Sequence, residues 1–223
     1  MTSSIETAIS NFGRTAKLKL SNPAATGQPE DQLRAPFEQL LEDVATLCGF
    51  RAGTVVAVGE TSQRDLKTRP DFSVTVSKAL VGFVELKAPG KGANPPRFKD
   101  PHDKAQWEKL SSLPNLLYTD GNSFSLWQDG KLVGSVLTLK GDIDTSGAKL
   151  APTPGLLPLF ESFLRWRPVA PRSARELAHT TARLCGFLRD EVTELAVSLA
   201  GLTTSTDRLG NSMIGSSVIS WSE

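Results

Sequence analysis

The sequence has few cysteines, almost no net charge and no long apolar run, and each shortage excludes a class of protein. Cys48 and Cys185 are too few and too scattered for a disulfide framework or a thiolate zinc site. The formal charge of +1 excludes a basic surface over the whole protein, so any contact with nucleic acid must be a local patch. No apolar run approaches the ~18 residues of a spanning helix, and the start lacks the features of a signal peptide. We expect a reduced, cytoplasmic protein with no membrane partner.

The chain has an ordinary globular composition, with 39% hydrophobic and 22% charged residues. Apolar residues at helical spacing predict a short helix from Ile5 to Phe12, closed by Gly13, and a second from Leu33 to Leu47, ended by Gly49. Pro36 must lie in the first turn of the second helix or kink it. Another helix is expected over 103–110.

Six runs rich in β-forming residues predict a sheet between Thr54 and Leu139. Asp129-Gly130 is a strong signal for a two-residue hairpin between the last two runs. The runs cover 54–58, 72–76, 80–86, 116–118, 123–128 and 132–139. We therefore predict an α/β fold, with a mixed central sheet flanked by helices and a helical extension at the C-terminal end.

The chain divides into three parts by composition. Residues 1–150 are expected to form the α/β domain, and residues 145–154 read as a linker. Apolar residues at helical spacing predict helices over 156–166 and 172–202, so 151–202 is expected to be a helical coupler. Residues 203–223 contain six serines and no repeating apolar period, which is typical of a disordered or truncated tail.

Two carboxylates and one ammonium group are predicted to meet on the hairpin of residues 69–91. A turn centred on Lys78 puts Asp71 opposite Glu85, and opposed residues share a face with Cβ atoms ~5 Å apart. Because side chains alternate along a strand, Lys87 lies on the same face as Glu85. Val84 and Leu86 then point the other way, into the core.

Such a cluster has a definite chemistry. Two close carboxylates repel each other, so one keeps a proton or a cation lies between them. A small number of oxygen ligands, completed by water and phosphate, suits Mg²⁺, with Mn²⁺ as a substitute. The metal can polarise a phosphoryl oxygen, and a nearby lysine can hold the attacking water or the developing charge. The cluster therefore predicts phosphodiester hydrolysis.

Four sequence blocks carry a resemblance to a known family. Pro70-Asp71 followed by Glu85-Leu86-Lys87 resembles the signature of the PD-(D/E)xK nuclease superfamily. The blocks Arg-Pro-Asp-Phe (69–72), Val-Glu-Leu-Lys-Ala-Pro-Gly-Lys-Gly (84–92), Gln-Trp (106–107) and Leu-Pro-Asn-Leu-Leu-Tyr-Thr-Asp-Gly (113–121) are similar to the N-terminal nuclease domain of single-chain restriction–modification enzymes, of type IIG or type ISP. The type I restriction motor subunit is a more distant relative.

The resemblance implies a role for each matched residue. Asp71 and Glu85 would bind Mg²⁺, Lys87 would be catalytic, and Gln106 would position the substrate or the metal-bound water. Members often add an acid from the first core helix, as Glu-x-x-x-Arg, and Glu30 with Arg34 fits this spacing. Glu38 and Glu42 are alternatives on the same helix. The family further implies cleavage of duplex DNA leaving a 5′-phosphate.

A basic loop follows the proposed site. Six cations oppose three acids between residues 87 and 109, a surplus of three positive charges that can hold a phosphate backbone. Lys91, Arg97, Lys99 and Lys104 are the candidate DNA-binding residues. Trp107 is expected to be a packing residue, and His102 and Asp103 are expected to cap the helix that follows.

Other interpretations remain open. A Glu-x-Lys pair on a strand is often a solvated face, where ion pairs contribute little. The fold could serve as a non-catalytic DNA-binding module. The chain could also be the N-terminal piece of an adenine-specific methyltransferase fused to a nuclease, with the motor or methyltransferase partner lying outside it.

Overall fold

The computed structural model describes residues 4–59 and 70–167, together with isolated positions between 178 and 193. Residues 1–61 and 68–170 form one compact unit, described here; the second unit, 62–67 and 171–223, falls almost wholly outside the described residues. The expected tail (203–223) and most of the expected helix over 172–202 therefore lie outside them, as does Arg69. Among the described helices, none combines the length and the apolar character needed to cross a bilayer.

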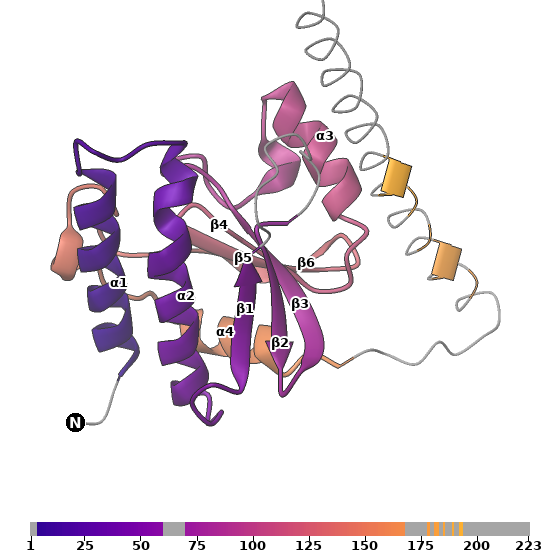
Figure 1. Cartoon of the computed structure of the whole chain (residues 1–223), viewed down its shortest axis with the longest axis horizontal. Helices are drawn as coiled ribbons and strands as arrows, with labels where there is room; N and C mark the ends of the chain where they lie inside the picture. Colours follow the sequence, from indigo (N-terminus) through magenta and orange to yellow (C-terminus); the bar gives the residue numbers. More distant parts are fainter. Residues whose placement is uncertain are drawn as a thin grey trace, which may run out of the picture. The chain divides into compact units, whose positions relative to one another are not determined.

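The described residues of this unit form four α-helices, six strands and two short 3₁₀ helices, and Figure 1 shows their arrangement. The helices are α1 (Ile5–Leu20), α2 (Pro29–Leu47), α3 (Pro101–Leu110) and α4 (Leu156–Leu164). The strands are β1 (Val55–Gly59), β2 (Phe72–Val76), β3 (Ala79–Leu86), β4 (Leu116–Thr119), β5 (Ser123–Gln128) and β6 (Lys131–Thr138). The 3₁₀ helices are η1 (Pro95–Arg97) and η2 (Gly147–Lys149).

The strands form one six-stranded sheet in the order β1-β2-β3-β4-β5-β6. Neighbouring strands are antiparallel except β3 and β4, which are parallel and are connected through α3. A parallel pair needs such a crossover, whereas the antiparallel pairs need only turns. The mixed α/β sheet flanked by helices that the sequence predicts is confirmed.

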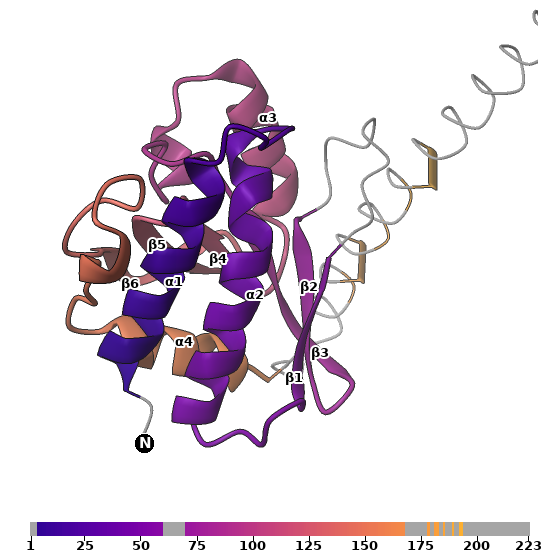
Figure 2. The same ribbon diagram turned by 60° about the vertical axis from the view of Figure 1, so that its left-hand side comes forward.

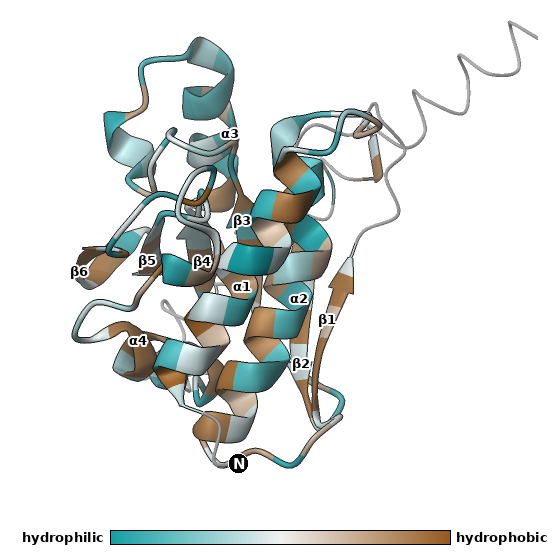
Figure 3. Cartoon of the chain, turned by 90° about the vertical axis from the view of Figure 1, so that its left-hand side faces the viewer, coloured by the Kyte–Doolittle hydropathy of each residue, from teal (hydrophilic) through white to brown (hydrophobic). Residues whose placement is uncertain are grey.

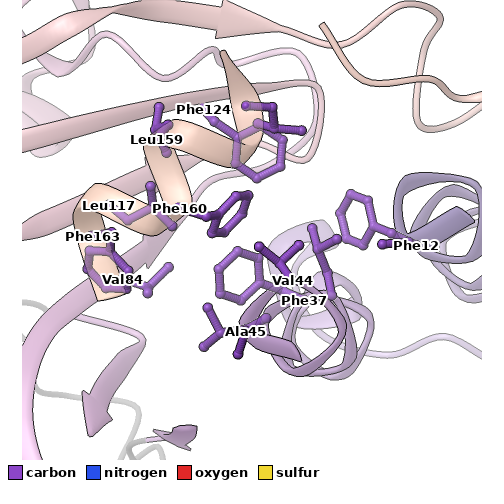
Figure 4. Packing of buried hydrophobic residues seen from close by; sticks show 14 of the residues in the cluster. Phe12, Phe37, Val44, Ala45, Val84, Leu117, Phe124, Leu159, Phe160 and Phe163 are labelled. Atoms are coloured by element: carbon purple, nitrogen blue, oxygen red, sulfur yellow. The ribbon is translucent and has the colours of Figure 1, made fainter. Parts of the chain in front are cut away.

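The hydrophobic core lies between one face of the sheet and the helices α1, α2 and α4. In Figures 1 and 2, α1 and α2 run side by side, and in Figure 3 both carry hydrophobic and hydrophilic residues, as expected for helices with one buried face. Figure 4 shows aromatic and aliphatic side chains of these helices meeting those of the strands. The fully buried members include Phe37, Val84, Leu117, Phe124 and Phe160.

Helix α1 does not end at Gly13, as the sequence predicted, but continues to Leu20. Gly13 is present for a different reason, which is the close approach of η2. A Cβ at Gly13 would lie 2.3 Å from the carbonyl oxygen of Gly147 and 2.7 Å from Cβ of Leu150. The missing side chain therefore lets two backbone segments pack together.

Helix α2 begins earlier than the apolar pattern indicated. Pro29 occupies its first turn, and the backbone N–H of Gln28 donates to the Asp31 carboxylate over 3.0 Å, closing a capping box. Pro36 therefore lies inside the helix, beyond the first turn, where it cannot donate the usual backbone hydrogen bond. The early start adds Glu30 to the helix that carries Arg34.

Helix α4 packs on the same core as the sheet, with Leu156, Phe160 and Phe163 buried. The side chain of Asn115, before β4, donates to the carbonyl oxygens of Val81 (2.8 Å) and Phe163 (3.0 Å), which ties α4 to β3. The first part of the expected coupler, 151–164, thus belongs structurally to the sheet unit. The expected linker over 145–154 is also ordered, since it holds η2 and a bridge between residues 140 and 151.

Candidate active site

The hairpin of β2 and β3 places the predicted acids opposite each other, although its turn is not the one expected. The turn consists of Ser77 and Lys78, both with positive φ. The strand pairs next to the turn are therefore centred between these two residues, and not on Lys78 as expected. An extra residue in β3, Val81, then shifts the register by one position, because Leu80 pairs with Thr75 but Gly82 pairs with Val74.

Beyond this bulge the register is the predicted one. Phe72 pairs with Val84, so Asp71, one residue earlier, lies at the level of Glu85. The backbone N–H of Leu86 donates to Asp71 Oδ2 over 2.7 Å, which fixes the carboxylate at the end of the hairpin. Val84 and Leu86 are buried in the core on the other face, as strand alternation requires.

Asp71 is held from two directions. Its Oδ2 accepts the Leu86 N–H, and its Oδ1 accepts a short hydrogen bond from Nη2 of Arg34 in α2. The aspartate side chain is 13% exposed, against 29% for Arg34. The guanidinium therefore supplies the positive charge next to a largely desolvated carboxylate.

Glu85, Lys87 and Gln106 form a closed hydrogen-bonded triangle on the face of the sheet opposite the core formed by Val84 and Leu86. Lys87 Nζ donates to Glu85 Oε1 over 2.9 Å and to Gln106 Oε1, while Gln106 Nε2 donates to the same Glu85 oxygen over 2.7 Å. Glu85 and Lys87 come from the end of β3, and Gln106 comes from α3. The second glutamate oxygen, Oε2, is buried with no hydrogen-bond partner.

The electrostatics of the cluster follow from burial. Burial, reinforced by the nearby Asp71 charge, raises the pKa of Glu85 to about 8, although Lys87 lowers it. Burial likewise raises the pKa of Asp71 above its ordinary value, against the opposing effects of Arg34 and the Leu86 N–H. Burial lowers the pKa of Lys87, but the neighbouring acids outweigh this and raise it above its usual range. The two acids thus lie where a further cation would be stabilising.

The three candidate acids of the first core helix differ in their relation to the site. Glu30 is half-buried, and its charge raises the pKa of Asp71. Glu38 and Glu42 are exposed. Glu30 lies four residues before Arg34, so both side chains lie on one face of α2. Of the three acids, Glu30 is the one whose charge acts on Asp71.

The donor set fits a hard divalent cation with few protein ligands. Across residues 4–59 and 70–167, no three histidine, cysteine, aspartate or glutamate side chains lie close enough to share a metal ion, so Asp71, Glu85 and Glu30 do not form such a group. Mg²⁺, however, is commonly held by one or two carboxylates together with water and phosphate oxygens. The unpartnered Glu85 Oε2 is an oxygen that can take this role.

The predicted DNA-binding residues lie on the loop after β3 and on α3. Arg97, Lys99 and Lys104 are exposed. Lys91 has a side chain that is 43% exposed and is paired with Asp103 over 2.5 Å. The loop backbone is anchored by Asp120, whose Oδ2 accepts the N–H of Gly92 over 2.7 Å. Of these four side chains, Lys91 is the one that the described contacts link to the cluster, because its partner Asp103 also lies 3.6 Å from Lys87.

Sequence reasoning assigned Asp103 the wrong role. The carboxylate that caps α3 is Asp100, which accepts the N–H groups of His102 and Asp103 over 2.8 and 3.2 Å. Pro101 at the first helical position was the available signal, because a proline there places the cap one residue earlier. Asp103 is instead buried and faces Lys87 and Lys91.

Tyr118 is a residue to which the sequence assigned no role. It pairs with Glu85 across the parallel strands, so the two side chains share a face, and its buried hydroxyl has no hydrogen-bond partner. Burial, with the nearby acids, raises its pKa far above the ordinary value. Trp107 packs against Tyr118 and Trp127, with ring centroids 5.9 and 4.8 Å apart, which confirms its predicted packing role.

Comparisons with known proteins include a distant structural likeness. No family profile matches the chain, and no curated protein matches it. A solved cryo-electron-microscopy structure of a DrdV–DNA complex is similar over 74% of this chain and 14% of that one, with 22% sequence identity and a TM-score of 0.46. The chain therefore spans a small fraction of the length of that protein.

Proposed function

We propose that this chain is a Mg²⁺-dependent deoxyribonuclease domain that hydrolyses phosphodiester bonds of duplex DNA, as the cleavage module of a restriction–modification protein. The observation that carries the proposal is Glu85, a buried carboxylate beside Asp71 that has one oxygen held by Lys87 and Gln106 and the other without a partner. A purely structural ion pair would satisfy both oxygens, because an unpartnered buried oxygen is costly.

Asp71 and Glu85 would hold the cation, which, when bound, supplies Lewis-acid polarisation of a phosphoryl oxygen and a more acidic water. Lys87 keeps its ammonium group next to these acids and can donate to oxygens of the scissile phosphate as they gain charge. Gln106 holds Lys87 and Glu85 together and orients both. Arg34, released from Asp71, can neutralise the same phosphate.

The surrounding charges favour a DNA backbone as the substrate. Lys91, Arg97, Lys99 and Lys104 lie on the loop and helix that adjoin the site, where they would bind phosphates flanking the one that is cut. These contacts carry no sequence information. We therefore assign recognition of a particular sequence to a domain other than this one, as the family resemblance implies.

The proposal is tested by incubating supercoiled and linear duplex DNA with Mg²⁺ or Mn²⁺. Wild type is expected to cut and to leave 5′-phosphate ends, whereas Asp71→Asn, Glu85→Gln and Lys87→Ala should each lose about 100-fold or more in rate. Glu38 and Glu42 are exposed on α2, so Glu38→Gln and Glu42→Gln are matched controls. Glu30→Gln should be less active than these controls, because the charge of Glu30 acts on Asp71.

Two results would overturn the proposal. Equal cleavage by wild type and all site variants would place the activity elsewhere. DNA binding without cleavage by wild type, unaffected by Lys87→Ala, would instead support the non-catalytic DNA-binding module.

A further inference from the structure

Asp103 is a buried carboxylate that the cleavage chemistry described above does not use. Its side chain is 5% exposed, and it lies in the first turn of α3, where Asp100 already caps the helix. A desolvated carboxylate is costly unless it is paired, so its surroundings must compensate for its burial.

Two lysines provide that compensation, and they belong to different parts of the proposed site. Asp103 Oδ1 lies 3.6 Å from Nζ of Lys87, and Oδ2 lies 2.5 Å from Nζ of Lys91. Lys87 is the 9%-exposed lysine of the Glu85–Gln106 triangle, and Lys91 is the 43%-exposed lysine that opens the basic loop. The Asp103 carboxylate therefore contacts both the buried Lys87 and the more exposed Lys91.

We propose that Asp103 is a positioning residue that holds Lys87 in place for catalysis and competes with DNA phosphate for Lys91. The inference rests on the proposed nuclease function and deepens it. Lys87 needs a fixed ammonium position, and Asp103 is its third partner beside Glu85 and Gln106. Lys91 is accessible enough for a backbone phosphate to replace Asp103 as its partner.

This arrangement predicts opposite effects on rate and on binding. In Asp103→Asn, the single-turnover cleavage rate should fall about 10-fold or more, because Lys87 loses one of its anionic contacts. DNA affinity of the same variant should rise several-fold, because Lys91 is freed and a repelling charge is removed. A merely structural role would leave rate and affinity unchanged or lower both together.

Exposed Glu108 on the same helix gives a charge-matched control. Glu108→Gln should keep the wild-type cleavage rate within about 2-fold and tighten DNA binding by less than Asp103→Asn does. The conservative Asp103→Glu keeps the charge and should recover part of the rate. An unchanged cleavage rate or weakened DNA binding in a folded Asp103→Asn protein would overturn the inference while the nuclease function stands.

Pulsed acylation of lysine amines, read by mass spectrometry, tests the same contacts in the wild-type protein. It depends neither on cleavage activity nor on the folding of a variant. In the wild-type protein, Lys87 and Lys91 should react more slowly than exposed Lys99 and Lys104, and addition of a short duplex without metal should change the rate at Lys91. Reaction of Lys91 as fast as Lys104 would contradict the pairing with Asp103. If wild type cuts no DNA, the proposed function fails, and this labelling still decides whether Asp103 holds the two lysines.

Discussion

Glu85 shows at the scale of one side chain what a cation at the proposed site would compensate. Its carboxylate is buried, one oxygen is bonded by Lys87 and Gln106, and the other has no donor. Burial and the charge of Asp71 raise its pKa from the ordinary 4.5 to about 8. The folded protein therefore binds a proton at Glu85 more tightly than the unfolded chain does.

The stability of the metal-free protein should consequently fall as pH rises. An acid whose pKa is raised by folding contributes stability that is complete below the unfolded pKa, near 4.5, and is lost as pH rises through the folded value, about 8. Between pH 4.5 and 8.5 in a chelator, wild type should lose roughly 3 to 5 kcal/mol relative to Glu85→Gln, at ~1.4 kcal/mol for each tenfold change in proton affinity. Urea unfolding of both proteins at several pH values measures this difference.

The comparison with Glu85→Gln cancels the titration of groups that do not interact with Glu85. A stability difference between the two proteins that stays constant over this pH range would show that Glu85 has no raised pKa. Addition of Mg²⁺ should stabilise wild type more at pH 8.5 than at pH 5, because protons compete with the cation for the same carboxylates.

Strand alternation made part of this site predictable from residue types alone. Glu85 and Lys87 share a face because they are two residues apart in a strand, and Val84 and Leu86 had to face the core. Asp103 and Tyr118 were not predictable in the same way. Their contacts depend on where α3 crosses the sheet and on the parallel pairing of β3 with β4, and neither feature has a local signal.

At the scale of elements, the β2–β3 hairpin shows how a correct prediction can rest on a different structure. The sequence suggested a turn centred on Lys78, whereas the turn uses Ser77 and Lys78, and the extra Val81 restores the expected pairing. A bulge of this kind leaves no clear mark in a pattern of apolar residues. The register at Asp71 and Glu85 therefore follows from the turn and the bulge together.

Substitution of Gly13 tests the close packing of α1 against η2. Alanine usually favours a helix over glycine by about 1 kcal/mol. Here a Cβ would lie 2.3 Å from the Gly147 carbonyl oxygen, a backbone atom that cannot move aside on its own. Gly13→Ala should therefore destabilise the protein by roughly 1 to 3 kcal/mol, measured by urea unfolding.

Exposed Thr15 in the same helix provides the control for helix propensity. Thr15→Ala should be neutral or slightly stabilising, since it gains propensity without a clash. A Gly13→Ala protein as stable as Thr15→Ala would show that η2 does not pack closely on α1.

For the whole molecule, the formal charge is only +1, but residues 87–109, which include part of the proposed site, carry six cations against three acids. DNA binding through this patch should weaken steeply with salt, because each neutralised phosphate releases counterions. Replacing the four candidate DNA-binding residues by glutamine should lower the slope of log Kd against log salt concentration by about 3 to 4. The four residues are Lys91, Arg97, Lys99 and Lys104. Fluorescence anisotropy with a labelled duplex, at several salt concentrations, measures the slope.

A variant with the same loss of charge elsewhere on the surface is the control. Four exposed cations outside the loop and α3 serve this purpose, namely Arg14, Lys19, Lys131 and Lys140. Their replacement by glutamine should leave most of the salt slope intact. Equal slopes for the two variants would mean that net charge, rather than the loop, governs binding.

The central claim is that Asp71 and Glu85 together bind a divalent cation beside Lys87. Anomalous diffraction from crystals soaked in Mn²⁺ tests it most directly. We expect a peak within about 2.0 to 2.6 Å of one carboxylate oxygen from each acid, with Glu85 Oε2 among the ligands. A peak elsewhere, or none, with Glu85 still bonded only to Lys87 and Gln106, would contradict the account.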